Sequence, residues 1–184
     1  MRNKYNLNRK SGFTLIELLI VIAILGTLAV VVLLALNPAQ QLARTRDAGR
    51  ISAITQLGHA LEAFSTTRSG YPPVAGGGAL CGTATNWLDC LVTAGEIQVK
   101  PAAVGAVTCG TQGNQNNWCY NVGTVNTLPA MVIYAKMESQ AQNSRCSANQ
   151  VAWAAYSSVD GKGGILCTAN ANTPPTVQTQ AFLP

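Results

Sequence analysis

The sequence predicts an α+β protein in which a long N-terminal helix packs on a small antiparallel sheet. Residues 18–36 carry no charge, and at about 1.5 Å per residue this run would form a helix of roughly 28 Å, close to the hydrocarbon thickness of a bilayer. Further on, apolar residues recur at helical spacing: Ile51, Ile54, Leu57, Leu61 and Phe64. After residue 74 the composition shifts to Gly, Thr and Asn with short apolar runs, which is typical of strands and turns.

The first twelve residues are a short basic leader. They contain Arg2, Lys4, Arg9 and Lys10, whereas the whole chain has 12 basic and 7 acidic residues. Without the leader the balance is 8 against 7, so the remaining body is almost neutral. Basic residues before an apolar run place the N-terminus in the cytoplasm and the downstream chain outside.

We expect residues 13–68 to form one helix, kinked at Pro38. Its first part, 13–36, would span the membrane, and its second part, 37–70, is amphipathic and needs a partner surface. Ser69-Gly70-Tyr71-Pro72-Pro73 would end the helix.

Residues 71–184 should supply that surface as a β-rich head outside the membrane. We expect a short helix within 86–97 and strands at 131–137, 150–157 and 165–168, the last two forming a hairpin across the turn at Asp160. The final residues resemble a loop or tail.

The six cysteines all lie in this head: Cys81, Cys90, Cys109, Cys119, Cys146 and Cys167. An even number downstream of a membrane signal indicates disulfides in an oxidising compartment, and zinc sites favour closely spaced pairs that are absent here. Of the 15 possible connectivities, we expect the sequential one, because each bond would close a short local loop.

Glu17 raises a question, since a carboxylate within a membrane-length segment costs about 2.5–3.5 kcal/mol. The surrounding stretch SGFTLIELLIVIAILG, residues 11–26, resembles the processing site and helix start of the type IV pilin family, which includes the pseudopilins of type II secretion. The similarity continues more loosely through residues 51–72. The resemblance implies a pilin-like fold.

It also implies cleavage between Gly12 and Phe13 by a prepilin peptidase, followed by N-methylation of Phe13. In a filament, the Glu17 carboxylate would pair with the cationic N-terminus of a neighbouring copy and set the register between subunits. The implied partners are further copies joined through their N-terminal helices, the peptidase/methyltransferase, an assembly ATPase, a platform membrane protein, and lipid before assembly.

The function we predict is that of a major pilin, a structural subunit of a type IV pilus-like filament. The alternatives are a pseudopilin of type II secretion and a minor tip pilin that acts as an adhesin or DNA receptor. The final location would then be an extracellular pilus or a periplasmic pseudopilus. An ordinary secretory signal or a plain anchor would explain neither the Gly-Phe junction nor Glu17.

No enzymatic constellation, metal site or cofactor is predicted. His59 and Glu62 share a helix face, which favours a surface contact over a catalytic pair, and Asp160-Gly-Lys-Gly-Gly lacks the carboxylates of a calcium loop. The near-neutral body argues against nucleic-acid binding by the free subunit, and we expect Arg44, Arg46 and Arg50 to face lipid or neighbouring subunits. The aromatic residues are expected to pack the core: Trp87, Trp118, Tyr120, Tyr134, Trp153 and Tyr156.

Overall fold

The computed structural model describes residues 12–75, 78–105, 109, 113–170 and 173–184. The chain divides into two units, residues 1–41 and residues 42–184.

The first unit contains helix α1, Leu15–Leu36, and the first residues of α2, Pro38–Arg68. The expected single helix over 13–68 is wrong, because Asn37 between them leaves helical geometry with φ 41° and ψ 75°. Pro38 disfavours the helical region for the residue before it, and asparagine tolerates the left-handed region better than most residues. Asn37 then accepts a hydrogen bond from the Gln40 amide through its main-chain oxygen at 3.0 Å, and so opens the next helix.

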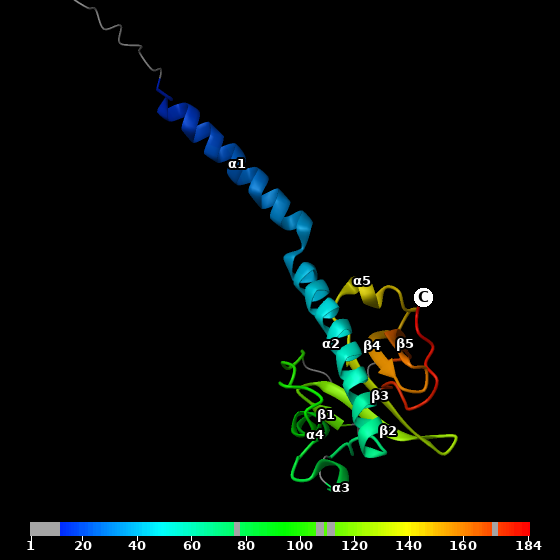
Figure 1. Ribbon diagram of the computed structural model, residues 1–184. Coiled ribbons are helices and arrows are strands. Elements are labelled where there is room, and N and C mark those ends of the chain that lie inside the picture. Colours follow the sequence, from blue (N-terminus) through cyan, green and yellow to red (C-terminus); the bar gives the residue numbers. More distant parts are fainter. Residues whose placement is uncertain (1–11, 76–77, 106–108, 110–112, 171–172) are drawn as a thin grey trace, which may run out of the picture. The chain divides into compact units, whose positions relative to one another are not determined.

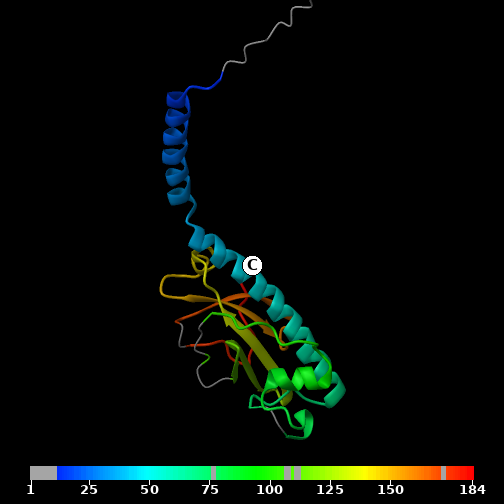
Figure 2. The ribbon, with the colours of Figure 1, turned by 90° about the vertical axis from the view of Figure 1, so that its left-hand side faces the viewer.

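The second unit is a five-stranded antiparallel sheet with α2 lying along one face (Figure 1; Figure 2). Its strands follow one another in space as in sequence: β1 Gly113–Gln115, β2 Trp118–Val125, β3 Leu128–Lys136, β4 Val151–Ser157 and β5 Lys162–Thr168. Three short helices complete it: α3 Gly78–Cys81, α4 Trp87–Ala94 and α5 Gln140–Asn143. The predicted α+β class with a helix on a small antiparallel sheet is confirmed.

Strands β3 and β4 sort their side chains to the two faces with the period of two that strands impose. On the face toward α2 they place Met131, Ile133, Ala135, Ala152, Ala154 and Tyr156. The apolar stripe of α2 and residues of α4, among them Trp87 and Leu91, close this core.

The opposite face of the sheet is also covered. Val132, Tyr134, Trp153 and Ala155 form a second core there, against which Val177 and Phe182 pack. The end of the chain is held by an isolated bridge between Leu166 and Phe182 and by a hydrogen bond from the Leu183 amide to the Ile165 oxygen at 2.7 Å. The final residues are an irregular loop, as one of the two expectations had it, and these contacts show that they are not a free tail.

A close approach between α2 and β4 depends on one glycine. A Cβ on Gly58 would lie 2.3 Å from Cγ of Tyr156, whose side chain is buried. Only a residue without a side chain lets the helix rest on this ring.

The predicted strands at 131–137, 150–157 and 165–168 correspond to β3, β4 and β5, and the short helix to α4. Strands β1 and β2 were not predicted, because the asparagine and glycine residues in Gly113–Gln115 and Trp118–Val125 favour turns when no tertiary partner is considered. The structure pairs residues 119–125 of β2 with β3.

Candidate functional site

The predicted cleavage junction lies just before α1. Gly12 and Phe13 are exposed and outside the helix, and a Cβ on Gly12 would meet no atom within 4 Å. Thr14 is the N-cap of α1, with extended backbone at φ −81° and ψ 150°. The junction is thus exposed, non-helical chain, separated from the helix only by Thr14.

Glu17 has a partner within its own chain. Its Oε2 accepts hydrogen bonds from the Thr14 amide at 2.9 Å and the Thr14 hydroxyl at 2.7 Å, and its own amide donates to Thr14 Oγ1 at 3.3 Å. This reciprocal arrangement is a capping box, which satisfies donors left free in the first helical turn. The sequence carries the signal for it, Thr14 followed three residues later by Glu17.

Helix α1 is apolar and unpacked. Its 22 residues, long enough at about 1.5 Å each for roughly 33 Å, include no buried residue. By length and composition α1 could cross a membrane. Such a continuous apolar surface in a chain marks a contact with lipid or with other proteins.

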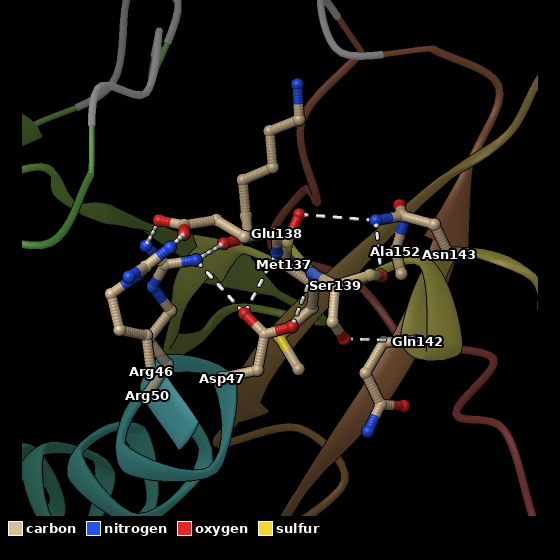
Figure 3. Close-up of polar contacts among 10 residues, drawn as sticks. Arg46, Asp47, Arg50, Met137, Glu138, Ser139, Gln142, Asn143 and Ala152 are labelled. Atoms are coloured by element: carbon tan, nitrogen blue, oxygen red, sulfur yellow. Dashed lines mark hydrogen bonds and ion pairs between the residues drawn. The ribbon is translucent and has the colours of Figure 1, made fainter. Parts of the chain in front are cut away.

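A second polar constellation joins α2 to the segment that follows β3 (Figure 3). The Glu138 carboxylate accepts a hydrogen bond from Nε of Arg46 at 2.7 Å and also forms an ion pair with Arg50. Arg50 donates to Asp47 Oδ1 at 3.1 Å and to the Lys136 main-chain oxygen at 2.8 Å. We call these four side chains, Arg46, Asp47, Arg50 and Glu138, the clasp.

Asp47 completes the clasp by forming hydrogen bonds with the main chain of the segment that follows β3. Its carboxylate accepts from the amides of Glu138 at 2.9 Å and Ser139 at 2.8 Å. Asp47 and Arg50 are buried, with 1% and 2% of their surfaces exposed. Paired and hydrogen-bonded in this way, the buried charges escape most of the cost of isolated ones.

The segment held by the clasp is anchored again on β4. Asn143 of α5 donates to the Ser139 oxygen at 3.0 Å and accepts from the Ala152 amide at 3.1 Å. Figure 3 shows these contacts continuing from the clasp across to Ala152. The clasp therefore fixes α2 to the sheet through one continuous network.

Burial of the Glu138 carboxylate acts to raise its pKa, but the hydrogen bonds from Arg50 and Arg46 outweigh it and leave the pKa below its ordinary value. The arginines were expected to face lipid or other subunits. For Arg50 this is wrong, because its guanidinium is buried within the head. Sequence reasoning missed the clasp because Glu138 lies 88 residues from Arg50.

A pocket of about 520 Å³ lies beside the clasp, lined by Arg50, Gly105, Lys136, Met137, Glu138, Asn143 and Val151. A Cβ on Gly105 would lie 3.2 Å from Nη2 of Arg50 and against the Glu138 carboxylate. The Gly105 main chain therefore closes over the ion pair.

The remaining residues that the sequence analysis singled out lie at the helix surface or in the core. His59 lies 3.8 Å from Glu62 and 3.4 Å from the Tyr156 hydroxyl, a contact at the helix surface. All six aromatic side chains assigned to the core are buried, at most 2% exposed: Trp87, Trp118, Tyr120, Tyr134, Trp153 and Tyr156. Among the described residues, no group of three or more His, Cys, Asp or Glu side chains could hold a metal ion.

The cysteines form three disulfides, Cys81–Cys90, Cys109–Cys119 and Cys146–Cys167. This is the sequential pairing expected from the sequence. The bonds link α3 to α4, the segment before β1 to β2, and the segment after α5 to β5.

Comparison with known proteins identifies the N-terminal segment. No curated protein and no solved structure matches the chain. Residues 7–33 match the family described as the prokaryotic N-terminal methylation motif. This range includes the Gly12–Phe13 junction, Thr14, Glu17 and most of α1, and the chain therefore carries a prepilin-type signal of the kind found in type IV pilins and pseudopilins.

Proposed function

We propose that the protein is a major pilin, the structural subunit of a type IV pilus-like filament. The observation that carries the proposal is α1: a membrane-length apolar helix with no buried residue, preceded by an exposed Gly12–Phe13 junction inside a methylation motif. Such a surface is stable in lipid before assembly, and in a bundle of identical helices afterwards.

Processing would begin with hydrolysis of the Gly12–Phe13 peptide bond by a prepilin peptidase on the cytoplasmic side. The basic leader, residues 1–12, leaves with a new carboxylate on Gly12, and Phe13 gains a free amine that is then methylated and stays cationic. A glycine before the bond fits the reaction, because the peptidase can close on a residue without a side chain.

Glu17 would then act in assembly. In the free chain its carboxylate is held by the amide and hydroxyl of Thr14, which lowers the cost of placing it at the start of an apolar helix. Oε1 has no hydrogen bond among the described residues, so it remains able to accept from the cationic Phe13 amine of a neighbouring copy. That pairing would fix the axial register between subunits.

The proposal places the chain in the inner membrane as a single-pass precursor, N-terminus inside, and later in an extracellular pilus. Its partners would be further copies, the peptidase/methyltransferase, an assembly ATPase and a platform protein. The looser similarity of residues 51–72 to major pseudopilins favours a second candidate, a periplasmic pseudopilus of type II secretion.

The test is an intact mass with N-terminal sequencing of material sheared from cells. A major pilin begins at methylated Phe13, dominates the sheared fraction, and is six hydrogens lighter than its reduced form because of its three disulfides. A chain that begins at Phe13 but stays in the membrane fraction indicates a pseudopilin or minor subunit. A chain that begins at Met1 contradicts the processing step.

A further inference from the structure

The buried stripe of α2 has a flank on each side, and the two flanks carry different residues and make different contacts. With 3.6 residues per turn, Arg46, Ala53 and Gln56 lie on one flank, while Arg44, Ala48 and Thr55 lie on the other. Contacts agree with this division: Ala53 and Gln56 line a groove with the segment 97–101, whereas a Cβ on Gly163 at the start of β5 would lie 3.2 Å from Thr55 Oγ1.

The first flank holds an apolar groove, and the residue before the groove's Ile97 in the chain is a carboxylate without a partner among the described residues. The groove, about 300 Å³, is lined by α2 and by the segment after α4: Ala53, Gln56, Leu57, Ile97, Gln98, Val99 and Pro101. Val99 is 79% exposed. The adjacent Glu96 makes no side-chain hydrogen bond or ion pair with any described residue.

Glu96 is unusual in this respect. The other acidic side chains of the described chain are all engaged: Glu17 by Thr14, Asp47 and Glu138 by arginines, Glu62 by His59, Asp89 by Lys100, and Asp160 by the Gln180 amide. A carboxylate without a partner among the described residues, three positions before an exposed valine, is suited to an intermolecular contact.

The second flank presents the complementary charge. Arg44 is exposed, and its guanidinium has no hydrogen bond or ion pair within the part of the chain that the structure describes. It therefore differs from Arg46 and Arg50, which are bound in the clasp.

We propose that the groove and Glu96 of one copy receive the Arg44 flank of a second copy. The Arg44 guanidinium would pair with Glu96, and its aliphatic stem would cover Val99. Because the two surfaces differ and lie on opposite flanks of one helix, the contact is heterologous, and a heterologous contact that does not close generates an open helical assembly. The inference rests on the proposed filament and names a lateral contact between the heads within it.

The test uses a cross-linking reaction that the native pair, Arg44 and Glu96, cannot undergo. A carbodiimide joins a carboxylate to a lysine amine in contact with it, with loss of water, but does not couple arginine. In sheared filaments of the full chain carrying Arg44→Lys, we expect a covalent dimer whose cross-linked peptide joins positions 44 and 96. The matched controls, wild type and Arg44→Lys/Glu96→Gln, should lack that peptide.

Charge reversal supplies a second measurement. Glu96→Arg and Arg44→Glu should each reduce the sheared filament by roughly fivefold or more, since like charges at a contact are strongly unfavourable, and the double exchange should restore it. Lys136 is the rival partner, because its ammonium also has no partner among the described residues. Rescue of Glu96→Arg by Lys136→Glu, or a cross-link from Glu96 to Lys136, would overturn the assignment to Arg44.

The failure of this inference differs from the failure of the proposed function. Abundant filaments of Arg44→Lys without the cross-link overturn the lateral contact and leave the filament intact. If the wild type yields no filament, the proposed function itself fails, and the lateral contact fails with it.

Discussion

Replacement of Gly58 by alanine tests how closely α2 must approach the sheet. The added Cβ would lie 2.3, 2.4 and 2.8 Å from Cγ, Cδ1 and Cδ2 of Tyr156, whereas ordinary contacts begin near 3.4 Å. The ring or the helix must therefore move by roughly 1 Å. The ring cannot move easily, because Tyr156 is 1% exposed and packs within the core between α2 and the sheet.

Overpacking of this kind costs about 1–3 kcal/mol, and three close contacts place Gly58→Ala at the upper end. Alanine is favoured over glycine within a helix by about 1 kcal/mol, so we expect a net loss of about 2 kcal/mol in the free energy of unfolding. For a domain of this size that corresponds to a melting temperature lower by about 4–8 °C.

The assay is thermal unfolding of the full chain in detergent, followed by tryptophan fluorescence. It reports on the head alone, because the three tryptophans, Trp87, Trp118 and Trp153, are buried there. Gly49→Ala is the matched control: it lies on the same helix, its Cβ would meet no atom within 4 Å, and it should stabilise the head slightly. A Gly58→Ala protein that melts at or above the wild-type temperature would refute the close-approach argument. If Gly58→Ala lowers the stability by the same amount in a Tyr156→Leu background, the tyrosine ring is not the cause of the loss.

Three further predictions concern the clasp, the disulfides and Glu17. The depressed pKa of Glu138 means that its contribution to stability is present above its unfolded pKa and is lost as pH falls through the lower folded value; Glu138→Gln should therefore flatten the acid side of the stability profile, and an unchanged profile would contradict the clasp. Alkylation of the unreduced protein should label none of the six cysteines, whereas labelling of any pair shows that its disulfide is absent. Glu17→Val should leave membrane insertion intact and impair filament assembly, and normal filaments from this variant would exclude charge pairing as the role of Glu17.

Features carried by local sequence were predictable. The apolar run of α1, the helical stripe at Ile54, Leu57 and Leu61, and the strands β3, β4 and β5 each follow from the spacing of side chains over a few residues. The Gly12–Phe13 junction and Glu17 were recognisable because the whole motif lies within one short segment.

Features that needed distant partners were not predictable. Strand β2 contains Asn121 and Gly123, which are disfavoured in strands, and it becomes a strand because β3 pairs with its residues 119–125. The C-terminal segment looked like a tail because its few apolar residues, Val177 and Phe182, acquire a surface only when the second face of the sheet exists.

The sequence by itself determined the long apolar helix, the prepilin-type signal and the class of fold, because these depend on composition, periodicity and a contiguous motif. Only the tertiary structure decided that Arg50 and Asp47 are buried partners of the segment at Glu138. It likewise decided that Gly58 lies against the ring of Tyr156. It also decided that Arg44 and Glu96 have no partner among the described residues. The physical reason is that burial and charge pairing are set by groups brought together across the fold, and nothing in the neighbouring sequence specifies them.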